Sequence, residues 1–128
     1  MKKIIVALLL TTVFASVLFA ASLVEPSVIT TPLSAQDNNT VKLAILAGSR
    51  DKGWVPKVVS DTEITAMLNN RNHSVTVSIV FSKTGYTIKY KDSVNMDYDA
   101  KNNQIHRKYN QWVANLNKAI SKRTDMSK

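Results

Sequence analysis

The chain of 128 residues contains no cysteine, and this absence removes several classes of protein. A small domain without cysteine has no disulfide and must be stabilised by its hydrophobic core alone. Catalysis by a thiolate and zinc sites built with cysteine are excluded. A lipid anchor attached to cysteine is excluded for the same reason.

Glycine and histidine are scarce, with three and two copies. The chain therefore has no glycine-rich loop of the kind that cradles phosphate or forms an oxyanion hole. His73 and His106 stand apart without a carboxylate pair, so they do not predict a zinc site. Asp92, Ser93 and His106 supply the residue types of a hydrolase triad, but no G-x-S-x-G turn presents the serine. We expect a protein that is not an enzyme and uses no cofactor.

Acidic residues are outnumbered by basic ones, 9 to 17, which gives a formal net charge of +8. Without Lys2 and Lys3, which belong to the N-terminal segment described next, 15 basic residues remain and the net charge is +6. A surface of this sign attracts polyanions. No run of four or more basic residues concentrates the charge, so the sequence favours solubility alone as the explanation of the net charge.

Residues 1–22 have the three-part pattern of a secretory signal peptide, with a positive start, an apolar run and small residues before a cleavage point after Ser22. The alternative is an uncleaved membrane anchor, because the run is close to the shortest that spans hydrocarbon. Either interpretation predicts export to the periplasm or cell envelope. The expected partner is then an unknown envelope protein or an anionic envelope polymer, not nucleic acid. Contact with the membrane is expected only through an uncleaved N-terminal segment.

The remainder of the chain divides into three parts. Residues 23–40 contain Pro26 and Pro32 among small polar residues and show neither helical nor strand periodicity, which predicts a flexible spacer. Residues 41–122 are expected to form a single α+β domain. Residues 123–128 are expected to be a disordered tail.

The clearest strand signal runs from Ser74 to Lys91, where apolar and polar residues alternate on both sides of Lys83-Thr84-Gly85. This pattern predicts an antiparallel hairpin with one buried and one solvated face. Gly85 is expected to supply the positive φ of the turn. The solvated face is predicted to carry hydroxyl and lysine side chains, namely Thr76, Ser78, Thr87, Lys89 and Lys91.

Two further strands are predicted before the hairpin. Residues 54–60 are rich in valine, but Pro56 lacks a backbone donor, which restricts this strand to an edge of the sheet. Residues 63–69 alternate as a strand, although the same residues are compatible with a helix. Together with the hairpin they predict a four-stranded antiparallel meander.

Two helices are expected to cover the meander. The first is predicted to be short, capped by Thr40 and beginning at Val41, with its end bracketed by Gly48 and Gly53. The second spans residues 105–120 and has one apolar stripe, made of Ile105, Tyr109, Trp112, Val113, Leu116, Ala119 and Ile120. The expected fold is a two-layer α+β sandwich in which the longer C-terminal helix is the main cover of the sheet and Trp112 one of its principal buried residues.

The loop between the last strand and this helix is acidic and was tested as a calcium site. The run from Asp97 begins like a calcium loop, but Asn102 replaces the glycine and Lys108 replaces the closing glutamate. No metal site is therefore predicted there.

Two motifs nearby resemble a known family. YTIKYKDSVNMDYD from Tyr86 to Asp99 and IHRKYNQWVANL from Ile105 to Leu116 resemble the pattern Y-x-I-x-Y-K-D-S-x-N … I-H-x-x-Y-N-x-W-V-x-N-L of small, mostly uncharacterised bacterial envelope proteins, many described as lipoproteins. The resemblance implies a single exported α+β domain and carries no established activity. Relatives often have a cysteine at the signal cleavage site, which this chain lacks.

The polar residues of these motifs are the candidate site. They are Asp92, Ser93, Asn95, Tyr98, His106 and Asn110, with Lys89 and Lys91 from the hairpin. One hypothesis is structural, that Asp92, Ser93 and Asn95 bond loop amides and the start of the helix. The other is a shallow ligand pocket. The predicted function is a non-enzymatic exported envelope protein that binds or scaffolds, and the alternative is a small-ligand or metal-binding module at the Asp92–His106 junction.

Overall fold

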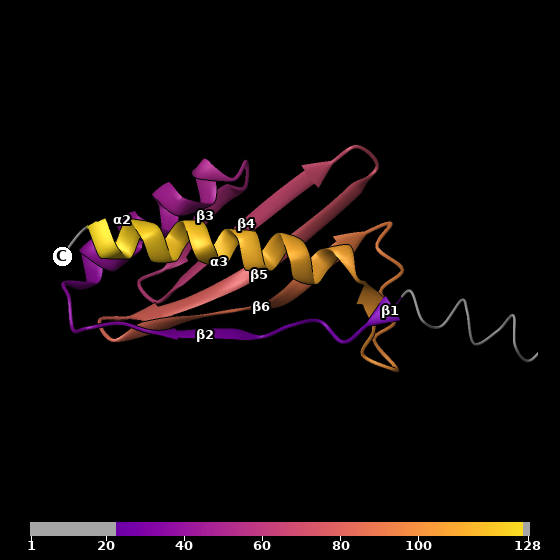
Figure 1. Ribbon diagram of the computed structural model, residues 1–128, viewed down its shortest axis with the longest axis horizontal. Coiled ribbons are helices and arrows are strands. Elements are labelled where there is room, and N and C mark those ends of the chain that lie inside the picture. Colours follow the sequence, from indigo (N-terminus) through magenta and orange to yellow (C-terminus); the bar gives the residue numbers. More distant parts are fainter. Residues whose placement is uncertain (1–22, 127–128) are drawn as a thin grey trace, which may run out of the picture.

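The computed structural model describes residues 23–126, shown in Figure 1. The predicted signal peptide, residues 1–22, and residues 127–128 lie outside the described residues. The elements in chain order are β1 (Leu23–Val24), β2 (Ile29–Pro32), α2 (Asn38–Asp51), β3 (Val55–Ser60), β4 (Glu63–Asn70), β5 (His73–Ser82), β6 (Gly85–Val94), β7 (Ile105–His106) and α3 (Lys108–Met126). The fold is α+β. Neither helix of this part of the chain is long and apolar enough to cross a membrane.

The sheet is larger than the four-stranded meander expected from the sequence. Within residues 23–126 it has five antiparallel strands in the order β2-β6-β5-β4-β3, and β1 pairs separately with β7. The extra strand comes from the segment predicted to be a flexible spacer, which is a correction. Thr30 pairs with Thr87 across β2 and β6, and their hydroxyl oxygens lie 3.1 Å apart. A strand of four residues ending in proline has no readable alternation, and its structure depends on this pairing.

The predicted hairpin is confirmed as β5 and β6, joined by Lys83 and Thr84. Ile79 pairs with Ile88 on the buried face. The prediction that residues 54–60 form an edge strand is also confirmed, because β3 is the last strand of the sheet. On the solvated face, Lys89 is exposed, but Ser78 is buried.

Gly85 has the positive φ that was expected, 159°. Glycine is also required there for space. A Cβ atom at this position would lie 2.8 Å from the carbonyl oxygen of Thr31 in β2. Glycine therefore permits the close approach of β2 to the start of β6.

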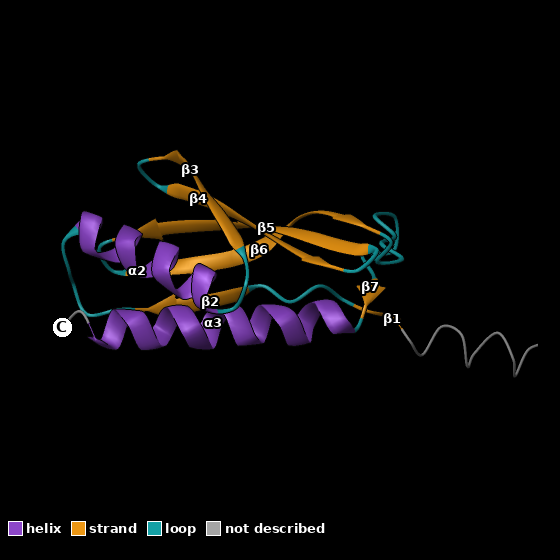
Figure 2. Ribbon diagram, turned by 90° about the horizontal axis from the view of Figure 1, so that it is seen from above, coloured by secondary structure: helices purple, strands orange, loops and turns teal. Residues whose placement is uncertain are grey.

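The helix α3 lies along one face of the sheet, as Figure 2 shows. It begins at Lys108 rather than at Ile105, because residues 105–106 form β7. It continues to Met126, so the prediction of a disordered tail is wrong for residues 123–126. Its buried stripe consists of Tyr109, Val113, Leu116, Ala119, Ile120 and Thr124.

The core lies between this stripe and the inward residues of the sheet. The expectation that Trp112 is a principal buried residue is corrected, since Trp112 is only partly buried and packs at the margin of the core. The buried tryptophan is Trp54, which is 3% exposed. On the 3.6-residue period, Trp112 falls at the boundary between the apolar and polar sides of the helix, a position that periodicity alone does not resolve.

The helix α2 is longer than the short helix expected and starts earlier. Its N-cap is Asp37, whose carboxylate accepts hydrogen bonds from the backbone N–H groups of Asn39 and Thr40 at 3.1 and 3.3 Å. Thr40 was predicted to be the cap and lies inside the helix. Aspartate is as effective a cap as threonine, so the choice depended on the surrounding fold.

Gly48 lies within α2 and does not end it. A Cβ atom at Gly48 would lie 2.6 Å from the Cα atom of Ile120 and 2.7 Å from its backbone nitrogen. The two helices therefore touch backbone to backbone at this point. The helix ends after Asp51, and Gly53 follows with a left-handed φ of 79°.

Gly48→Ala is expected to destabilise the protein by about 1–3 kcal/mol, because the added methyl group overlaps the α3 backbone. Helix propensity alone predicts the opposite, a stabilisation of about 1 kcal/mol. Urea denaturation followed by circular dichroism distinguishes the two, with Ala47→Gly in the same helix as the control for propensity. A more stable Gly48→Ala protein would contradict the close contact.

Candidate functional site

The residues predicted as a site lie where β6 leads into α3, and three of the eight, Asn95, His106 and Asn110, bond backbone groups through their side chains. Asn110, on α3, accepts the backbone N–H of Ser27 at 2.8 Å and donates to the carbonyl oxygen of Glu25 at 3.0 Å. It therefore attaches the segment between β1 and β2 to the helix. Both bonds satisfy backbone groups outside regular pairing.

His106 and Asn95 act in the same way. Nδ1 of His106 accepts the backbone N–H of Lys108 at 3.1 Å at the start of α3, and the His106 N–H donates to the carbonyl of Met96. Asn95 has a left-handed φ of 59° and donates through Nδ2 to the carbonyl of Asn72 at 2.7 Å. Asparagine tolerates this conformation better than most residues. Asn95 thus joins the end of β6 to the β4–β5 turn.

Ser93 and Tyr98 belong to an aromatic cluster. The hydroxyl oxygens of Ser93 and Tyr90 lie 2.9 Å apart, and the rings of Tyr90 and Tyr98 stack with centroids 4.2 Å apart. Tyr109 meets the edge of Tyr90 at 5.7 Å. Burial raises the pKa of both Tyr90 and Tyr109. The three rings pack against one another, and the raised pKa keeps Tyr90 and Tyr109 neutral at ordinary pH.

Asp92, Lys89 and Lys91 complete the predicted set and are exposed residues of β6. Lys89 pairs with Ser78 and Asp92 pairs with Thr76, while Lys91 is the extra residue of a bulge between these pairs. The structure therefore does not gather the eight predicted residues into one pocket. His106 lines a hollow of about 30 Å³ with Trp112 and neighbouring side chains. That volume is the share of a single water molecule.

The metal-binding alternative has little geometric support in the described chain. Among residues 23–126, no group of three or more His, Asp or Glu side chains is placed to hold a metal ion. Asp99 instead bonds its own loop, accepting the N–H groups of Lys101 and Asn102 at 3.1 and 3.3 Å. These bonds, with one from the Asn102 side chain, hold the pKa of Asp99 below its usual value.

A different feature offers more room. A row of hollows follows one side of α3, opposite the β4–β5 turn and the end of α2. The α3 residues that line it recur at steps of four, three, four, three and four positions, which places them on one side of the helix. They are Lys108, Trp112, Asn115, Ala119, Lys122 and Met126, and Arg123 lines the furrow beside Lys122. We term this row the α3 furrow.

The hollows of the α3 furrow adjoin one another. The first has a volume of about 320 Å³ and is lined by Asn70, Arg71, His73, Lys108 and Trp112. The second, of about 80 Å³, is lined by Lys52, Trp54, Leu68, Trp112 and Asn115. The third, of about 430 Å³, is lined by Asp51, Lys52, Ala119, Lys122, Arg123 and Met126. The first two share Trp112 and the last two share Lys52.

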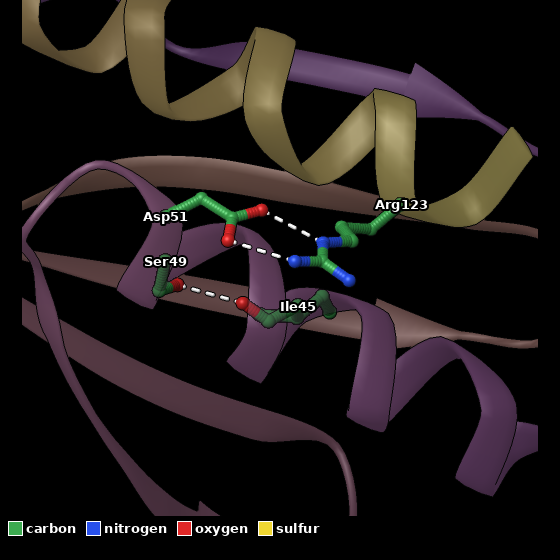
Figure 3. Close-up of polar contacts among 4 residues, drawn as sticks. All are labelled: Ile45, Ser49, Asp51 and Arg123. Atoms are coloured by element: carbon green, nitrogen blue, oxygen red, sulfur yellow. Dashed lines mark hydrogen bonds and ion pairs between the residues drawn. The ribbon is translucent and has the colours of Figure 1, made fainter. Parts of the chain in front are cut away.

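An ion pair crosses the far end of the furrow, drawn in Figure 3. Nε and Nη2 of Arg123 donate to the two carboxylate oxygens of Asp51 at 2.7 and 2.8 Å. This hydrogen bonding and the guanidinium charge hold the pKa of Asp51 below its usual value. In the same figure Ser49, buried beside the helix contact, donates through Oγ to the carbonyl of Ile45 at 2.7 Å. The bidentate contact with Arg123 neutralises the charge of Asp51.

Sequence reasoning missed the furrow, although part of its signal was visible. Lys108, Asn115 and Lys122 lie outside the apolar stripe predicted for this helix, and Trp112 was assigned to that stripe. The opposite wall comes from Lys52 and Arg71, which lie in other parts of the chain. Only the fold brings these cations to the helix.

No protein-family model matches the chain, and no curated protein matches it. The resemblance to small envelope proteins therefore stays a prediction.

Asn95→Ala is expected to cost about 1–3 kcal/mol, because alanine disfavours the left-handed conformation and cannot bond the carbonyl of Asn72. Asn95→Gly restores the conformation and is expected to recover about half of the loss. Asp92→Ala, at an exposed strand position three residues earlier, is the control and should change the urea midpoint little. Equal stability of Asn95→Ala and the native chain would refute the structural role.

Tyr86 and Tyr109 form a matched pair for a second test. Both are buried, but the hydroxyl of Tyr86 donates to Oδ1 of Asn117 at 2.7 Å, whereas the buried hydroxyl of Tyr109 has no hydrogen-bond partner among the described residues. Tyr86→Phe is expected to cost about 1–2 kcal/mol, and Tyr109→Phe to leave stability unchanged or raise it. Thermal and urea denaturation of the two variants measure the difference. The reverse order would contradict these assignments.

Proposed function

We propose that the protein is a non-enzymatic binding domain of the cell envelope and that its α3 furrow holds a linear anionic polymer. The observation that carries the proposal is the charge of the lining. Its cations are Lys52, Arg71, Lys108, Lys122 and Arg123, and its carboxylate is Asp51. Because Asp51 is already neutralised by Arg123, the furrow is strongly positive and favours a polyanion.

The shape of the furrow favours a polymer over a compact ligand. From Lys108 to Met126 the lining residues cover eighteen helical steps, or roughly 27 Å at 1.5 Å per residue. The hollows of about 320, 80 and 430 Å³ succeed one another along this length. A wide hollow at each end with a narrow one between them suits an extended chain. The hollow at the Asp92–His106 junction, at about 30 Å³, has no comparable room for a small ligand.

The envelope location is supported by sequence. The N-terminal segment has the pattern of a secretory signal, and the two motifs around β6 and α3 resemble those of envelope proteins. The polyanions of that compartment are lipopolysaccharide, anionic lipid surfaces and wall polymers. Of these, an extended wall or surface polymer fits a furrow better than a flat lipid surface does.

The test compares two double variants of equal charge. Lys108→Gln with Lys122→Gln removes two cations from the furrow, and Lys57→Gln with Lys89→Gln removes two exposed cations from the sheet. A basic side chain near an anionic surface contributes about 1 kcal/mol. The furrow variant is therefore expected to bind an acidic polysaccharide or polyphosphate about thirtyfold more weakly, with the sheet variant close to the native chain.

Binding is measured by isothermal titration calorimetry at low and high salt. Affinity should fall as salt rises, because exposed charges are screened over about 10 Å at 0.1 M ionic strength. Equal losses in the two double variants would mean that net charge alone attracts the polymer. Absence of binding to both polyanions at low salt would overturn the proposed function.

A further inference from the structure

Trp112 is the one aromatic side chain shared by two adjoining hollows of the furrow within residues 23–126. It is partly buried, so one part of the indole packs on the core while another borders the hollows. Trp112 differs in this respect from Trp54, the other tryptophan, which is 3% exposed and therefore almost fully covered. The placement of Trp112 offers a flat apolar surface to an occupant of the furrow.

The neighbours of Trp112 on the helix are polar and of two kinds. Lys108 lies one turn before it and Asn115 one turn after it, so both are surface neighbours of the indole at helical spacing. Arg71 and Asn70 line the same hollow from the β4–β5 turn. Cations, amides and one aromatic face therefore surround one position. Cations recognise negative groups, amides recognise hydroxyl groups by donating and accepting, and an indole stacks on a ring.

We infer that the polymer held by the α3 furrow is an acidic polysaccharide, in which negative groups are carried on sugar rings and one ring stacks on Trp112. This inference rests on the proposed function and narrows it. A polyphosphate satisfies the cations but has no ring for Trp112 and no hydroxyl groups for Asn115 and Asn70. Single-stranded nucleic acid has both charge and rings, but its binding sites use several accessible aromatic side chains in succession. Of the two tryptophans that line this furrow, Trp54 is buried and Trp112 alone is partly exposed, beside amides.

The experiment compares four probes of similar length by titration calorimetry. They are an oligogalacturonide, which has rings and charge; a polyphosphate, which has charge alone; a dextran oligosaccharide, which has rings alone; and oligo-dT. The native chain should bind the oligogalacturonide most tightly. Trp112→Leu, which keeps an apolar side chain at the core margin, should weaken that binding about tenfold or more and change polyphosphate binding less than twofold.

Fluorescence of the native chain gives a second readout that needs no substitution. Trp54 is buried, so quenching by acrylamide reports mainly on Trp112. The oligogalacturonide should reduce the quenching, and polyphosphate should not. A melting temperature of Trp112→Leu within a few degrees of the native value shows that any loss of binding is local.

The other outcomes of the titrations separate failure of the inference from failure of the proposed function. If polyphosphate binds as tightly as the oligogalacturonide, or Trp112→Leu weakens both equally, the inference is wrong and the proposed function stands. If oligo-dT binds most tightly, the occupant is a nucleic acid and the inference is overturned. If none of the charged probes binds, the proposed function fails as well.

Discussion

The contact between the backbones of α2 and α3 at Gly48 and Ile120 determines much of the rest of the structure. It requires a residue without a side chain at one position in α2 and buries the adjacent Ser49, whose hydroxyl must then bond within its own helix. Because α2 ends one turn later, Asp51 is carried to within hydrogen-bond distance of Arg123. Lys52 follows directly and becomes part of the opposite wall of the furrow. The close contact between α2 and α3 thus makes Arg123 the partner of Asp51 and fixes the position of one end of the α3 furrow.

The helix α3 has four sides with different tasks, all set by the 3.6-residue period. One side is buried against the sheet through Tyr109 and Leu116. A second side faces the N-terminal segment, where Asn110 bonds residues 25 and 27 and Asn117 accepts the hydroxyl of Thr31 at 3.0 Å. The third lines the furrow, and the fourth is solvated. Asn110 and Asn117 thus hold the N-terminal segment on one side of the helix, while the cations of the furrow lie on another side.

Sequence patterns could predict the parts of the fold whose signal is local. The β5–β6 hairpin was predictable because Ile79, Phe81 and Ile88 alternate with polar residues, which is local information. The edge position of β3 was predictable because Pro56 lacks a donor whatever its surroundings. The strand β2 was not predictable, since its four residues are held by β6 and by α3, both distant in sequence.

The site was harder to predict than the fold. The motif residues Asn95, His106 and Asn110 were recognised as polar groups at a junction, and each of them bonds backbone groups there. Asp92 and Ser93 were grouped with Asn95 in one structural role, but Ser93 contacts the hydroxyl of Tyr90 and Asp92 is exposed. The furrow required knowledge that the β4–β5 turn and the end of α2 lie against the same side of α3. The end of α2 lies between Gly48 and Gly53 as predicted, but the contact of Gly48 with α3 was not foreseen, because a glycine needed for close approach and one near a helix end look alike in a single sequence.

The two outer strands of the sheet have a consequence for behaviour at high concentration. β3 exposes Val55, Val58 and Val59, by 62, 45 and 51%, and such an apolar border is a template on which amyloid-like stacking can begin. Pro56 and the irregularity after Val58 interrupt its hydrogen-bonding ladder, and Pro32 ends β2 on the opposite border. A second molecule that meets either edge strand therefore finds an interrupted row of backbone hydrogen-bonding groups. In a chain that has no disulfides to restrain partial opening, these interruptions keep colliding molecules from joining edge to edge into fibres.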